Sequence, residues 1–195
     1  MRNAIGYIVT VVAALCWGAS GISADYLMKS HGVELTLVSF FRTFTAGILI
    51  LGCVLARSRR ITTQHRELVT TRRNWPPLIS YAIFGLAACQ LSYMGVIRAS
   101  NAGTGTVLEY LGLILIVVWV CLSHRRWPRA SELIAMILAL TGTFLLSTHG
   151  TPGTLALTPV TLAWGGVAAP TLATYTLLPV RLIAAYGADV VVGYA

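Results

Sequence analysis

Arg42 and Glu109 are the residues of this sequence best suited to chemistry, because each interrupts an otherwise apolar stretch. A charged side chain at the centre of a lipid bilayer costs ~3 kcal/mol or more, so such residues usually pair or line a functional pathway. At 1.5 Å of helix per residue, both would lie roughly 11–13 Å below the same membrane surface. We therefore expect them to meet. Two roles stay open: a solute-binding pair in which Glu109 exchanges a proton or holds a cation, and a structural pair that joins two helices.

Five further residues place aromatic or hydrogen-bonding groups at membrane depth and are candidates for the lining of the same cavity: Trp17, Gln90, Tyr93, Tyr110 and Trp164. The two tryptophans lie in the middle of apolar stretches, whereas the aromatic belt of membrane proteins lies at the ends. Packing and hydrogen bonds between helices explain these five residues as well as solute contact does.

Asp25 and Lys29 are four residues apart near the end of the first apolar stretch. Residues with this spacing are neighbours on a helix surface, so we expect an ordinary ion pair. The alternative, that Asp25 lines the mouth of a cavity, is the less favoured interpretation.

The sequence gives little support for a catalytic or metal-binding site. Residues 18–21 read Gly-Ala-Ser-Gly, similar to the nucleophile motif of intramembrane serine proteases. A nucleophilic serine needs a base within hydrogen-bond reach, and none of the four histidines lies in the middle of an apolar stretch. The four cysteines lie in apolar stretches and lack metal-binding spacing, so we interpret them as small, buried, unpaired apolar residues. We expect neither an enzyme, nor a metal site, nor a cofactor.

The composition indicates an integral membrane protein. Hydrophobic residues make up 56% of the chain and charged residues 10%, with a mean hydropathy of +0.77. Soluble domains are about a quarter charged, so this chain lacks the polar surface to face water on all sides. The net charge of +8 comes from arginines gathered in short polar segments, a pattern typical of topology signals. We expect membrane lipid as the surroundings and no nucleic-acid partner.

The apolar stretches predict an all-α, polytopic bundle of transmembrane helices, since about 20 apolar residues span a bilayer. Six spans are expected, over residues 5–27, 35–55, 78–97, 102–122, 133–147 and 161–178. The fifth is short and needs flanking residues, and Pro170 predicts a kink in the sixth. Lys and Arg favour the cytoplasmic side of membranes, so the arginines at residues 57–73 and 125–129 predict a cytoplasmic amino terminus in the inner membrane.

An internal repeat is visible, since Cys16-Trp17-Gly18 in the first span is similar to Ala163-Trp164-Gly165 in the sixth. Five spans separate the start of the two copies, so the second copy is inverted, as in many transporters. Residues 14–18, 39–43, 104–111 and 140–150 resemble the EamA family of the drug/metabolite transporter superfamily. The resemblance implies ten helices in two five-helix units, with residues 1–150 as the first unit and 151–195 as the start of the second.

The resemblance also implies a function: transport of small organic solutes, often outward, by alternating access, with proton coupling as an option. Two features depart from the family pattern. A leucine, Leu111, follows Tyr110 where similar proteins commonly have proline, and the chain carries six of the ten expected helices, so we expect a truncated transporter. The alternative is a non-transporting remnant, or a half-unit that a second copy or a complementary half completes.

Overall fold

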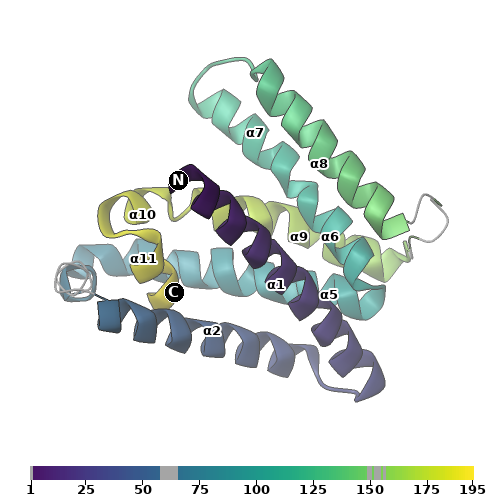
Figure 1. Cartoon of the computed structure of the whole chain (residues 1–195), viewed down its shortest axis with the longest axis horizontal. Coiled ribbons are helices and arrows are strands. Elements are labelled where there is room, and N and C mark those ends of the chain that lie inside the picture. Colours follow the sequence, from purple (N-terminus) through teal and green to yellow (C-terminus); the bar gives the residue numbers. More distant parts are fainter. Residues whose placement is uncertain (1, 58–65, 149–150, 152–154, 156) are drawn as a thin grey trace.

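The computed structural model of the chain describes all residues except 1, 58–65, 149–150, 152–154 and 156. The described residues form helices and short connections without a strand, which confirms the all-α prediction. In chain order the helices are α1 (Arg2–Ser30), α2 (Leu35–Arg57), η1 (Arg72–Asn74), α4 (Trp75–Ser80), η2 (Tyr81–Ala87), α5 (Ala88–Ala99), α6 (Ala102–Tyr110), α7 (Gly112–Ser123), α8 (Ala130–Thr148), α9 (Pro159–Leu177), α10 (Val180–Tyr186) and α11 (Ala188–Tyr194) (Figure 1).

Within the described residues, six helical stretches are long and apolar enough to cross a membrane, as predicted. Three of them, α1, α2 and α8, are single helices, and α8 gains the flanking residues that its short apolar stretch required. The other three are composite: η1 to α5, α6 with α7, and α9 with α10. Helix α9 is continuous through Pro170, and the kink there stays a prediction.

Two of the composite spans contain interruptions that hydropathy does not reveal. The fourth span breaks at Leu111, between α6 and α7. In the third span, residues 81–87 form a π-helix, and such turns are frequent at functional sites. Gly85 belongs to this segment, and a Cβ added there would lie 2.7 Å from the ring of Tyr81 and 3.3 Å from the Cα of Tyr175. Glycine therefore leaves room for the Tyr81 ring within η2 and for the close approach of α9.

Helix α5 lies at the centre of the bundle, because it contacts α1, α2, α6 and α9. Its buried residues include Tyr93, Met94 and Ile97, which form an apolar cluster with residues of α1 and the start of α2. Many large apolar side chains of the other helices are exposed; Leu146, for example, is 79% exposed. In a membrane these side chains face lipid, as the composition requires.

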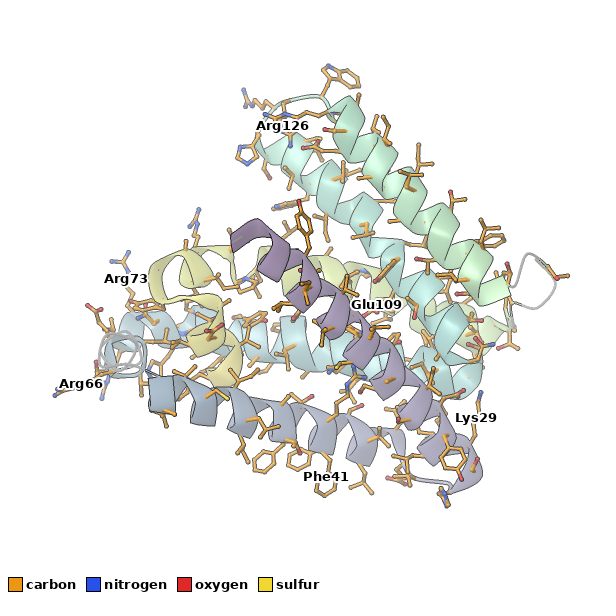
Figure 2. All side chains as sticks on the ribbon, in the orientation of Figure 1. Lys29, Phe41, Arg66, Arg73, Glu109 and Arg126 are labelled. Carbon is orange, nitrogen blue, oxygen red and sulfur yellow. The ribbon has the colours of Figure 1, made fainter. Side chains whose placement is uncertain are left out.

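Basic residues mark the two ends of the bundle. Figure 2 shows Arg66 and Arg73 at one end and Lys29 at the opposite end. Lys29 pairs with Asp25 at 2.8 Å, which confirms the predicted helix-surface ion pair, and it also donates to the carbonyl oxygen of Ser100. The second of these contacts joins the end of α1 to the end of α5.

The last two helices, α10 and α11, are short, and α11 packs along α2. A Cβ added at Gly193 would lie 2.9 Å from the side chain of Leu51, so the two helices touch closely. Figure 1 shows this segment, in yellow, beside α2.

Candidate functional site

Glu109 is the most deeply buried charged side chain among the described residues, with 2% of its surface exposed. Helix α6 begins with Asn101, whose side chain accepts a hydrogen bond from the backbone N–H of Thr104 at 2.8 Å. From this cap, Thr104, Gly105, Leu108 and Glu109 form the buried face of the helix. The cap fixes where the helix begins, and Glu109 follows two turns later on its buried face. Figure 2 shows Glu109 midway along the bundle.

The hydrogen-bond partner of Glu109 is the thiol of Cys89, whose Sγ lies 3.4 Å from Oε1 of the carboxyl group. Cys89 is buried and belongs to α5, so this contact joins α5 to α6. A thiol is a weak donor, and the rest of the carboxyl group's hydrogen-bonding capacity is unused by the described residues.

Arg42 lies on α2 and does not form the expected ion pair with Glu109. Among the described residues, no nitrogen of Arg42 lies within 4.0 Å of an oxygen of Glu109. Arg42 nevertheless lies within electrostatic range of Tyr93, Glu109 and Cys89. The prediction of direct contact was therefore wrong, because α5 packs against both α2 and α6 and its side chains lie close to both charges.

Tyr93 provides the neutral polar group of this cluster. Its hydroxyl oxygen lies 3.3 Å from Oγ1 of Thr106 on α6, and the side chain is 3% exposed. A Cβ added at Gly21 would lie 3.1 Å from the same hydroxyl, so glycine lets α1 approach α5 here. We call Arg42, Cys89, Tyr93 and Glu109 the polar cluster.

A cavity of about 510 Å³ opens at the end of the bundle where α1 joins α2. It lies between the start of α2, the end of α5 and the start of α9, and it is lined by Glu34, Leu35, Thr36, Gly95, Arg98, Ala99, Val160 and Trp164. The ring of Trp164 covers Gly95 so closely that a Cβ at Gly95 would clash with it. This cavity has the volume that a small organic molecule needs.

A sequence model of the EamA-like transporter family matches residues 4–148. The chain belongs to the EamA-like transporter family. It is 34% identical over 190 residues to the "uncharacterized inner membrane transporter YicL" of Salmonella typhimurium, and this match covers 97% of the chain and 62% of YicL. The "uncharacterized transporter YwfM" of Bacillus subtilis is 25% identical over 183 residues, which are 91% of the chain and 56% of YwfM.

The chain thus spans less than two thirds of the length of these relatives. No solved structure matches it. Family membership and the six apolar helices make the chain a multi-span membrane protein of a transporter family, with an inner membrane relative in YicL. A transporter family is also a different class of protein from the intramembrane protease that residues 18–21 suggested.

The structure divides the predicted site residues of this EamA-like chain into groups. Arg42, Tyr93 and Glu109 belong to the polar cluster, whereas Trp164 lines the cavity. Gln90 and Tyr110 are half-buried beside cluster residues on α5 and α6. Trp17 is 48% exposed on α1 and belongs to neither the cavity nor the buried core around Tyr93. Their roles in solute binding stay predictions.

Sequence reasoning missed Cys89 and Ser39 as members of the polar interior. Ser39 is 4% exposed on α2, one helical turn before Arg42. Cys89 was interpreted as a small apolar residue. One signal was present in the sequence: Cys89, Ser92, Tyr93 and Val96 follow the spacing of a single helix face, and all four are buried.

Proposed function

We propose that this EamA-like chain moves a small organic solute across the inner membrane by alternating access, in the outward direction, through the polar cluster. The observation that carries the proposal is the burial of the Glu109 carboxyl group in the middle of a membrane span. An ionisable residue at that depth is a functional candidate by default, because it is costly to keep there. Glu109 serves as the proton-exchange site, and Tyr93, Gln90 and Tyr110 supply hydrogen bonds to the solute.

An inverted repeat supports the alternating-access part of the proposal. Residues 1–150 form the first unit, and residues 151–195 begin the second. Figure 1 shows α1 and α9, which carry the two similar Trp-Gly segments, running in opposite directions along the bundle. In transporters built from inverted repeats, the solute lies near the midplane between the units, which is the depth of Glu109.

The orientation is proposed to place the amino terminus in the cytoplasm. A single cysteine introduced at Gln64, which lies outside the described residues, should be unreachable by an impermeant thiol reagent added outside intact cells. A cysteine at Thr151, on the opposite side, should be labelled. The unsubstituted chain, with its four cysteines inside the spans, gives the background. Labelling at residue 64 and protection at 151 would reverse the orientation.

Export should depend on Glu109. We expect cells that express the protein to release at least one small organic solute into the medium, and Glu109→Gln to reduce that release about a hundredfold or more, the effect typical of a removed proton-transfer group. The measurement is mass spectrometry of the medium, with membrane protein levels compared in parallel. Leu115→Ala, on a lipid-exposed position of α7, is the matched control and should leave release unchanged. Equal release by Glu109→Gln and the unsubstituted protein would contradict the proposal.

We propose as the second candidate that the chain acts as a half-unit of such a transporter. In that case the chain needs a second copy or a complementary half to complete the solute cavity. The same export measurement separates the two: the half-unit releases no solute when expressed alone and regains release when the missing part is supplied by co-expression.

A further inference from the structure

Two polar groups on one face of α2 point into the bundle without a hydrogen-bond partner among the described residues. They are Nη1 of Arg42 and Oγ of Ser39, and both atoms are buried. The two residues are three positions apart, so their side chains are neighbours on the helix surface. The aromatic residues between and beside them lie on the other face: Phe40, Phe41 and Phe44 are more than half exposed. Figure 2 shows Phe41 directed away from the bundle.

Leaving a buried charged donor without an acceptor is costly, so an interior guanidinium normally has a partner. The obvious acceptor, Glu109, is not within ion-pair distance, and its Oε1 accepts from Cys89 instead. Asp25, an acidic residue on α1, is paired with Lys29. Arg42 therefore keeps donor capacity that no acidic side chain of the described residues satisfies.

The 510 Å³ cavity begins one helical turn before these groups on α2. Leu35 and Thr36 line the cavity from α2, and Ser39 follows on the next turn of the helix. At 1.5 Å per residue, Thr36 and Arg42 are about 9 Å apart along the axis. The cavity lining carries one charge of each sign, Glu34 and Arg98, so the positive charge that no acidic side chain of the described residues pairs lies deeper in the bundle, at Arg42.

We propose that Arg42 and Ser39 bind the carboxylate of a small organic monoanion, which makes such monoanions the solute class of this protein. The inference rests on the proposed function, because it assigns a ligand to the same cluster. A guanidinium donor and a hydroxyl donor on adjacent turns match the two oxygens of a carboxylate. A dianion fits less well, because the site offers one cation and Glu109 lies within electrostatic range of it.

The test uses three probes that share one ring: benzoate, benzamide and benzylammonium. Their dissociation constants are measured by calorimetry on the full chain in nanodiscs of phosphatidylcholine. We expect benzoate to bind more tightly than the other two probes. Arg42→Gln should weaken benzoate binding about tenfold or more, and Ser39→Ala about fivefold, as expected for one charged and one neutral hydrogen bond. Phe41→Leu, on the outward face of the same helix, should leave it unchanged.

Further measurements separate failure of the monoanion assignment from failure of the proposed transport function. Adding phosphatidylglycerol to the nanodiscs should not weaken benzoate binding; loss of binding would assign the site to an anionic lipid headgroup. Preference for benzylammonium, lost in Glu109→Gln, would overturn the monoanion assignment and leave the proposed transport function standing. Equal binding of all three probes to the unsubstituted chain and to Arg42→Gln would overturn the monoanion site, whereas the export measurement with Glu109→Gln judges the transport function separately. If Arg42→Gln fails to fold, Arg42→Lys and Ser39→Ala still decide, because the first keeps the positive charge without the planar guanidinium and the second removes only one hydroxyl group.

Discussion

Replacement of Glu109 by Gln should destabilise the protein by about 2 kcal/mol, below the 3–5 kcal/mol of a contacting buried ion pair. The amide keeps the shape of the side chain and still accepts from the Cys89 thiol, so the change removes chiefly the negative charge. Arg42 is then left half-buried without the one negative charge in its electrostatic range. Its guanidinium cannot lose a proton to relieve the cost. The measurement is reversible unfolding in mixed micelles followed by circular dichroism.

Arg42→Gln should cost less than Glu109→Gln, because a carboxyl group left without a neighbouring cation can take up a proton and become neutral. The double variant should also be less destabilised than the sum of the two single variants, since each loses its effect once the other charge is gone. Tyr110→Phe, on the half-buried neighbour of Glu109, is the control and should lie within about 0.5 kcal/mol of the unsubstituted protein. Strictly additive single effects would show that the two charges do not interact.

The number, type and approximate limits of the spans could be predicted from the sequence, because hydropathy over about 20 residues reports the bilayer directly. The Asp25–Lys29 pair was also predictable, since its geometry depends on one helix alone. Contacts between helices were harder to predict from the sequence. The sequence predicted how deep Arg42 and Glu109 lie in the membrane. Whether their side chains touch also depends on which helix lies between them. Helix α5 lies between α2 and α6 and contacts both of them. The hydropathy of a segment does not indicate which other helices it packs against.

The interruptions of the third and fourth spans could not be predicted from the sequence either. The π-helix at Tyr81–Ala87 has Gly85 as its one visible signal, and a glycine in a membrane helix usually indicates close packing alone. The fourth span was predicted as one helix over residues 102–122, but it breaks at Leu111, between α6 and α7. The family resemblance implies a proline at this point; this chain has Leu111 instead, so no residue in the sequence indicates the interruption.

Gly112, which begins α7 directly after this interruption, is the glycine whose replacement should cost most. It is buried, and a Cβ added there would clash with the carbonyl oxygen of Ala169 on α9 and lie 3.0 Å from Cβ of Leu172. A backbone oxygen cannot move aside as a flexible side chain can, so α7 and α9 must separate. We expect Gly112→Ala to lower the free energy of unfolding by about 3 kcal/mol, the upper end for overpacking.

Gly142 provides the matched control, because it lies in the apolar helix α8 and a Cβ added there meets no atom of the described residues within 4 Å. Gly142→Ala should therefore change stability by less than about 0.5 kcal/mol. Gly112 also stands three residues after Glu109, so separation of α7 from α9 should disturb the helix that carries the buried carboxyl group. Equal unfolding free energies for the two alanine variants would mean that α7 and α9 are not in close contact at Gly112.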